Sequence, residues 1–180
     1  MVWQRALFTL YGTNIEAITV VVTAFMLGLG LGSLAGGAWS AKEGRPLLLA
    51  FAAIEGAIGL YGLISLDLFA AVGAVTLGAS ALQAFALSFA LVLLPTLGMG
   101  ATLPLLVAHL VKRLRSVGRA VSVLYFVNTL GAACGSIAAA VVILGPMGLR
   151  GSILLAAGLN LFVAVATLIA WAARRRSAST

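Results

Sequence analysis

The first long uncharged stretch of this 180-residue chain reads AITVVVTAFMLGLGLGSLAGGAWSA and covers Ala17–Ala41. As an α-helix, these 25 residues are long enough to cross the hydrocarbon core of a bilayer, which is about 30 Å thick. Three further stretches also lack Asp, Glu, Lys and Arg: Leu68–Val111, Ala120–Leu149 and Gly151–Ala173. A soluble domain of this size could not bury so much apolar surface. The sequence therefore predicts an all-α, polytopic membrane helix bundle.

Composition supports the same class. Hydrophobic residues make up 63% of the chain and charged residues 8%, whereas soluble domains have about 45–50% and about 25%. The formal net charge is +7, but no basic stripe with interleaved aromatic residues indicates nucleic-acid binding. We therefore expect one integral membrane domain over residues 1–180, with the lipid bilayer as its main partner and no nucleic acid.

Polar residues and helix breakers divide the chain into five expected spans: Ala17–Ser40, Leu47–Leu66, Gly78–Leu110, Ala120–Leu144 and Gly151–Ala173. Asp67 is expected to mark the far end of the second span, with Leu68–Leu77 as an outer loop or surface helix. Pro95 and Pro104 lie inside the third span, which we expect to be kinked or broken because proline removes a backbone hydrogen bond. A tight turn is expected over Gly145–Gly148.

The basic residues predict an orientation. With five crossings, three clusters fall on one side: the Lys42–Arg45 turn, the Lys112–Arg119 loop and the Arg174–Arg176 tail. Together they hold nine of the eleven basic residues. Because basic loops stay in the cytoplasm, we expect a cytoplasmic tail over residues 174–180 and an outside N-terminus.

Small residues recur at helical spacing and predict close helix contacts, since lipid supplies no hydrophobic drive between helices. Three faces are expected to pack in a tight bundle or a helix-mediated oligomer. They are Gly28, Gly32 and Gly36 in the first span, Glu55, Gly59 and Gly62 in the second, and Asn128, Gly131 and Gly135 in the fourth.

Glu55 is the candidate functional residue, because it is the one ionisable group expected at mid-membrane depth. A charge there costs about 2.5–3.5 kcal/mol, and no Lys or Arg lies in a span to pair with it. We expect a neutral or hydrogen-bonded carboxyl, with Gln83, Tyr125, Asn128 and Asn160 as candidate partners. Three interpretations stay open: a proton or solute site in a transport path, a structural glutamate that bridges helices, and a lipid-facing or interfacial position.

Other chemistry has little support in the sequence. His109 has no second ligand at metal-binding spacing, and Cys134 is expected to be a small buried hydrophobe. The Gly30, Gly32 and Ala35 spacing matches a dinucleotide fingerprint, but it lies in an uncharged run where no strand is expected. We therefore expect no enzyme activity, no cofactor and no metal.

Several stretches, taken in order, are similar to a known family. They are Trp3–Arg5 with Gly12–Asn14, Ala24–Gly28, Gly36–Gly37, Arg45–Leu47 with Glu55, Leu94–Thr96, Gly100–Pro104, Leu124–Tyr125, Asn128–Gly131 and Gly148–Gly151. They resemble the membrane half of bacterial fused spermidine synthase-like proteins, which is itself similar to half of a major facilitator superfamily transporter. The Pro95–Pro104 stretch is the most specific part.

The resemblance implies six helices, with one before the Trp3–Arg5 stretch, so residues 1–15 are expected to be a remnant of that helix. The family usually has a soluble aminopropyltransferase-like domain after the last span; we expect none here, so no transferase activity is carried over. The turn with Gly37, Lys42, Gly44 and Arg45 resembles the cytoplasmic turn between helices two and three of the transporter superfamily.

That turn departs from the transporter pattern, because its usual aspartate is Ala41 and its last basic position is Pro46. The resemblance implies a half-transporter of the bacterial inner membrane that moves a small cationic solute, such as a polyamine, as an oligomer. The alternative is a non-transporting scaffold or an accessory subunit of a larger complex. A homo-oligomer or other membrane subunits are the expected partners.

Overall fold

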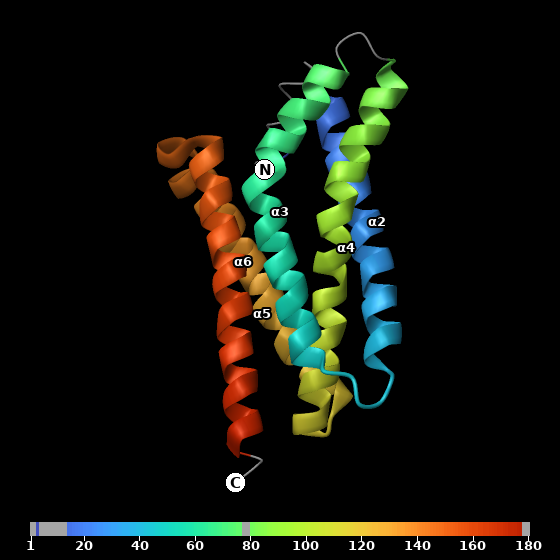
Figure 1. Ribbon diagram of the computed structural model, residues 1–180, viewed down its shortest axis with the longest axis vertical. Coiled ribbons are helices and arrows are strands. Elements are labelled where there is room, and N and C mark those ends of the chain that lie inside the picture. The colour runs from blue at the N-terminus through green and yellow to red at the C-terminus, as the bar shows by residue number, and fades with distance from the viewer. Residues whose placement is uncertain (1–2, 4–13, 77–79, 178–180) are drawn as a thin grey trace.

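All secondary-structure elements in the described part of the chain are helices. In a computed structural model, this part comprises Trp3, residues 14–76 and residues 80–177. The elements are α2 (Asn14–Ser40), α3 (Leu47–Val75), α4 (Ala81–Leu114), α5 (Val117–Ile137), the π-helix η1 (Ala138–Ile143) and α6 (Leu144–Ser177). They run up and down along one long axis (Figure 1). The all-α class expected from the sequence is confirmed.

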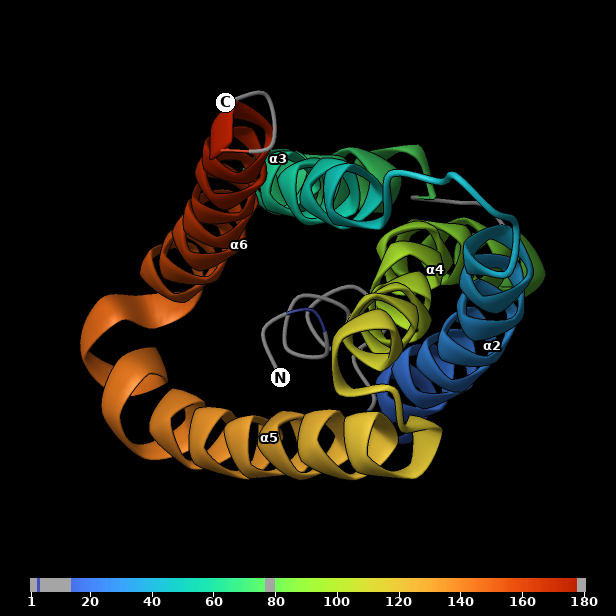
Figure 2. The same ribbon diagram turned by 90° about the horizontal axis from the view of Figure 1, so that it is seen from below.

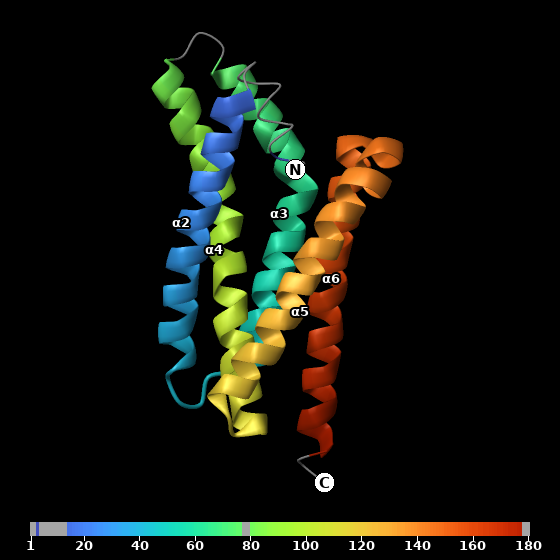
Figure 3. The ribbon, with the colours of Figure 1, turned by 180° about the vertical axis from the view of Figure 1, so that it is seen from behind.

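Four helical segments are long and apolar enough to cross a membrane: Ile18–Ser40, Leu47–Val75, Leu82–Leu114 and Val117–Arg176. The last has 60 residues and contains α5, η1 and α6. It does not run straight, because α5 climbs the bundle and α6 descends it (Figures 1 and 3). Gly148 lies where the chain reverses, with φ 63° and ψ −172°, a backbone conformation that is almost confined to glycine. The expected turn over Gly145–Gly148 coincides with this reversal.

The end of α3 differs from the sequence expectation. The helix continues past Asp67 to Val75, so the expected end at Leu66 is wrong. Of the two alternatives for Leu68–Leu77, a loop or a surface helix, the segment is helical as far as Val75, but as a continuation of α3; Leu77 lies outside the described residues. The Asp67 side chain is exposed, so its charge does not require the helix to end. The helix ends at Thr76, whose N–H and hydroxyl both donate to the Val72 carbonyl oxygen, at 2.9 and 2.7 Å.

The third span was expected to be kinked or broken, and the structure excludes the break, because α4 runs as one helix through Pro95 and Pro104. Proline at position 95 has no N–H, so the carbonyl of Leu91, four residues earlier, loses its helical donor. The Tyr61 hydroxyl of α3 donates to that same carbonyl oxygen at 2.6 Å. A neighbouring helix thus supplies the hydrogen bond that proline removes. Proline is tolerated within membrane helices because neighbouring groups can bond to the carbonyl that it leaves without a donor.

Glycines and a threonine bring α2 close to α4. A Cβ added at Gly36 would lie 2.7 Å from the Ala101 carbonyl oxygen, and Cβ atoms at Gly28 and Gly32 would overlap Thr96 and Leu97. Thr96 Oγ1 lies 3.3 Å from the Ala24 carbonyl oxygen across this contact. The first expected glycine face therefore lies against α4.

The helix connections gather the basic residues at one end of the bundle. The α2–α3 connection, the α4–α5 connection and the C-terminal end of α6 all lie there (Figure 1). They carry the three basic clusters described above. We call this the basic end.

Candidate functional site

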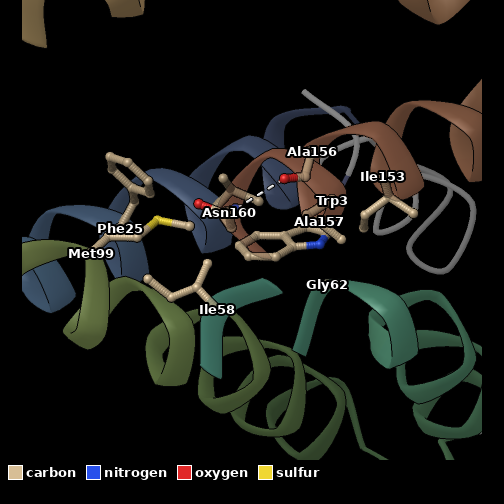
Figure 4. Close-up of a pocket in the computed structure, with 10 residues that line it drawn as sticks. Trp3, Phe25, Ile58, Gly62, Met99, Ile153, Ala156, Ala157 and Asn160 are labelled. Atoms are coloured by element: carbon tan, nitrogen blue, oxygen red, sulfur yellow. Dashed lines mark hydrogen bonds between the residues drawn. The ribbon is translucent and has the colours of Figure 1, made fainter. Parts of the chain in front are cut away.

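A central cavity of about 260 Å³ lies between α2, α3, α4 and α6 (Figure 4). Its walls are mainly apolar, and the residues that shape it include Phe25, Ile58, Met99, Ile153, Asn160 and Trp3. Asn160 and the indole N–H of Trp3 supply its polar side-chain atoms. An uncompensated charge would be costly in such surroundings, so the cavity suits an apolar or weakly polar group.

Trp3 is held in place by α3. Its indole Nε1 donates to Ser65 Oγ at 3.3 Å, and its ring meets Tyr61 edge-on with 6.0 Å between ring centroids. Ser65 Oγ in turn lies 2.9 Å from the Gly62 carbonyl oxygen, to which it donates. The indole N–H is therefore already engaged, and the tryptophan forms a wall of the central cavity. Residues 1–15 were expected to be a helix remnant. Of these, only Trp3, Asn14 and Ile15 are among the described residues.

Of Glu55 and its four candidate partners, Asn160 alone lines the central cavity; Gly62 of the second glycine face also lines it. Asn160 Nδ2 donates to the Ala156 carbonyl oxygen at 3.1 Å, within α6. The amide therefore satisfies part of its hydrogen-bonding capacity locally, as polar side chains in apolar helices commonly do.

Glu55 lies in the first third of α3, not at its middle. It follows Leu47 by about 12 Å of helix rise, and the midpoint of the helix is Tyr61 because α3 continues to Val75. Its side chain is half-buried. Within residues 14–76 and 80–177 no hydrogen bond or ion pair to Glu55 is found, and it is not among the residues that line the central cavity.

The other expected partners of Glu55 lie elsewhere. Gln83 caps the start of α4: its Oε1 accepts from the Ser80 N–H at 3.1 Å, and its own N–H donates to Ser80 Oγ at 3.3 Å. This end of α4 is opposite the basic end. Tyr125 and Asn128 are exposed on α5. The structure therefore does not bring the five predicted site residues together.

The second glycine face joins α3 to α6. A Cβ added at Gly59 would lie 3.0 Å from the Ala157 carbonyl oxygen, and one at Gly62 would lie 3.1 Å from the Ala157 Cβ. Gly131 and Gly135 of the third face have no heavy atom within 4 Å of an added Cβ. Two of the three glycine faces thus have a partner helix within the described chain, and the face on α5 has none.

Most side chains of α5 are exposed, and Leu124 is half-buried. All of its residues are described, and Ala120 alone is buried. The helix contacts α4 and η1 and otherwise forms one side of the bundle by itself (Figure 2). Cys134 is exposed on α5, so the expectation that it is buried is wrong for the isolated chain.

The turn between α2 and α3 is closed by Gly44, which has φ 73°. The guanidinium of Arg45 lies over the Trp39 ring, 5.3 Å from its centroid. The Gly37 carbonyl oxygen accepts from Ser40 Oγ at 2.9 Å, and Lys42 is exposed at the surface. These residues form a compact polar turn at the basic end.

Two sites outside the sequence prediction emerge from the geometry. The Tyr61 hydroxyl donates to the Leu91 carbonyl of α4. Pro95 indicates that this carbonyl needs a donor from outside the helix, but the sequence does not show that Tyr61 supplies it. His109 of α4 meets Arg174 of α6, with 3.5 Å between Nε2 and Nη1. The described residues contain no group of three or more His, Cys, Asp or Glu that could hold a metal ion.

Comparison of the chain with protein-family models, with curated proteins and with solved structures finds no match. The class that the structure defines is therefore an all-α protein with four long apolar helical segments that could span a membrane. Their exposed apolar surfaces suggest contact with a lipid bilayer.

Proposed function

We propose that this chain is a multi-pass membrane protein with five crossings: α2, α3, α4, α5 together with η1, and α6. The reversal at Gly148 supports the division of the 60-residue segment into two crossings. The shared position of the three basic clusters supports a cytoplasmic basic end. With the resemblance stated above, this corresponds to the inner membrane of a bacterium.

We propose further that the protein is a non-transporting subunit that associates with other transmembrane helices through α5. The observation that carries this proposal is the face with Asn128, Gly131 and Gly135, which no described residue covers at the two glycines. The equivalent glycine faces on α2 and α3 are filled by α4 and α6. In lipid, small residues let two helix backbones approach closely, and side-chain amides form hydrogen bonds between helices. A further helix can therefore pack on the glycines and bond to Asn128, which acyl chains cannot do.

The scattered polar residues favour a scaffold over a transporter. A path for a cation needs polar groups that converge along it, whereas Gln83 caps a helix and Asn128 lies outside the central cavity. The cavity is lined mainly by apolar side chains. We also propose, as the sequence suggests, that the chain has no catalytic activity of its own.

Cross-linking tests the proposal, because Cys134 is the single cysteine of the chain and lies on exposed α5. In native membranes, cross-linkers at Cys134 are expected to trap a discrete species, either a dimer of this chain or a complex with another subunit. The matched control moves the cysteine to α6, with Cys134→Ala and Phe162→Cys, because Phe162 is also highly exposed.

A glycine variant provides the second readout. Gly131→Leu with Gly135→Leu fills the open face without an internal clash, so the fold should persist while the complex is lost after mild detergent extraction. Gly158→Leu is the control, because Gly158 of α6 is equally open. If all these variants migrate as the same monomer as the parent chain, the subunit proposal is wrong.

A half-transporter for a small cationic solute is the second candidate, favoured by Glu55 and by the resemblance. An ionisable side chain within a membrane helix with no basic partner is a typical site for a cation. Proteoliposomes should then take up a polyamine, and Glu55→Gln should abolish uptake while the helix content stays unchanged. Absence of uptake by the parent protein would remove this candidate and leave the subunit proposal intact.

A further inference from the structure

A small pocket of about 160 Å³ lies between α3 and α6, toward the end of the bundle opposite the basic end. We call it the outer pocket, and its lining residues are Leu63, Leu66, Asp67, Arg150, Ile153 and Leu154. The two helices run side by side (Figures 1 and 3). The outer pocket therefore brings an acidic residue of α3 to a basic residue of α6.

Asp67 and Arg150 are the charged residues among those that line the outer pocket. Both side chains are exposed, and among the described residues neither side chain forms an ion pair or a hydrogen bond. Arg150 is also the one basic residue of the described chain that lies away from the basic end. The outer pocket thus presents one negative and one positive group, which is complementary to a ligand that carries both signs of charge.

The outer pocket lies at the depth of lipid headgroups. Asp67 follows Leu47, the first residue of α3, by about 30 Å of helix rise, which is about the thickness of the hydrocarbon core. Arg150 precedes Arg174 by about 36 Å of helix rise. With the basic end at one surface of the bilayer, both charges therefore reach the opposite surface.

Apolar side chains lie one helical turn closer to the membrane centre than the two charges. Leu63 precedes Asp67 by four residues and Leu154 follows Arg150 by four, so each apolar side chain shares a helix face with a charged one. Leu63 is 42% exposed and Leu154 is 48% exposed. This order of charge and apolar surface matches a lipid, in which acyl chains continue from the headgroup, better than it matches a free zwitterion.

The start of the descending part of α6 favours an anion beside Arg150. Helical dihedral angles are interrupted at Gly148, and the turn that follows carries the partial positive charge of a helix N-terminus. A guanidinium group also binds phosphate oxygens in a bidentate manner. The phosphate of a zwitterionic headgroup is therefore expected on the α6 side, and its cationic group at the Asp67 carboxylate on the α3 side.

We infer that the outer pocket binds the headgroup of phosphatidylethanolamine, with the ammonium group at Asp67 and the phosphate at Arg150. The acyl chains then lie along Leu63 and Leu154. A primary ammonium donates charge-assisted hydrogen bonds to a carboxylate, whereas the quaternary ammonium of phosphatidylcholine has no N–H to donate. The inference rests on the proposed membrane crossings and does not depend on a partner subunit at α5.

Lipid binding is measured on the purified full chain in a neutral detergent by native mass spectrometry. Phosphatidylethanolamine and phosphatidylcholine are the probes, because neither has a net charge that the basic end would attract. The parent chain should retain phosphatidylethanolamine in preference. Asp67→Asn should weaken this retention by about fivefold and remove the preference, because an exposed ion pair contributes up to about that factor.

Arg150→Gln should instead weaken the retention of both lipids by about fivefold, because both carry the phosphate group. The matched controls, Glu43→Gln and Arg119→Gln, each remove one charge of the same sign from an exposed position at the basic end. Each control should change the retention of either lipid by less than about twofold.

Two results would overturn the inference. One is equal retention of the two lipids by the parent chain. The other is an Asp67→Asn variant that keeps the preference for phosphatidylethanolamine, with circular dichroism unchanged. Either result would leave the five crossings standing, because the crossings are tested separately by labelling from the two sides of the membrane.

A third arm separates the lipid from a soluble zwitterion. Glycerophosphoethanolamine at the same concentration should leave the bound phosphatidylethanolamine in place, because it lacks acyl chains to lie along Leu63 and Leu154. Displacement of the lipid by this soluble compound would show a site for a free zwitterion and contradict the lipid assignment.

Discussion

The hydrogen bond from Tyr61 to the Leu91 carbonyl gives the sharpest prediction on stability. Tyr61→Phe keeps the ring, including its edge-on contact with Trp3, and removes only the hydroxyl that donates at 2.6 Å. The Leu91 carbonyl then has neither this donor nor a helical one, because residue 95 is proline. An acceptor left unpaired in apolar surroundings costs about 1–3 kcal/mol.

Hydrogen bonds between membrane helices are worth about 0.6 kcal/mol on average and up to about 1.7 kcal/mol. We therefore expect Tyr61→Phe to lower the free energy of unfolding by about 1–2 kcal/mol. Reversible unfolding of the purified chain by SDS in mixed micelles, followed by circular dichroism, measures this change. Tyr125→Phe is the control, because Tyr125 is 63% exposed and should change stability by less than about 0.5 kcal/mol.

A double-mutant cycle assigns the cause. Pro95→Ala restores an N–H that can donate to the Leu91 carbonyl within α4. In that background, Tyr61→Phe should cost less than about 0.5 kcal/mol, which gives a coupling of about 1 kcal/mol between positions 61 and 95. An equal loss in both backgrounds would refute the reasoning, because the hydroxyl would then not be replacing the missing N–H.

Three further predictions concern other contacts and use the same unfolding assay. Gly36→Ala should destabilise the chain by about 1–3 kcal/mol, because its Cβ would lie 2.7 Å from the Ala101 carbonyl oxygen, whereas Gly30→Ala meets nothing within 4 Å and should not destabilise it. Gly148→Ala should cost about 1–3 kcal/mol because of its φ of 63°, and a neutral result would show that the reversal does not need glycine. Ser80→Ala should cost about 1 kcal/mol by removing the cap of α4, and no loss would mean that the capping box is not formed in solution.

The sequence was sufficient for the helical class and the gathering of basic residues. The length of each stretch without charged residues predicts a long helix, and Gly145–Gly148 indicated the turn at which the chain reverses direction between α5 and α6. The end of α3 was misjudged because Asp67 was taken as a boundary, although an exposed carboxylate can lie within a helix. The sequence could not show whether α4 is broken at its prolines, because the Tyr61 hydroxyl that replaces one missing hydrogen bond comes from another helix.

The candidate site was harder to predict than the fold. A polar residue in an apolar helix indicates that its side chain needs a hydrogen-bond partner. The sequence does not show which partner, because the rotation and depth of each helix decide which groups that side chain faces. Gln83 was assigned to the interior, yet its spacing from Ser80 is that of a capping box. The glycine faces were recognisable, but the sequence could not tell that α4 covers one, α6 covers another, and the face on α5 stays open.

The central claim is that the chain crosses a bilayer five times with its basic end on one side. The direct test places single cysteines at Lys42, Arg115 and Met147 in a Cys134→Ala background and labels intact cells with an impermeant maleimide. With five crossings, position 147 should be labelled in intact cells, and positions 42 and 115 only after the membrane is opened. Labelling of position 147 from the same side as position 115 would contradict five crossings.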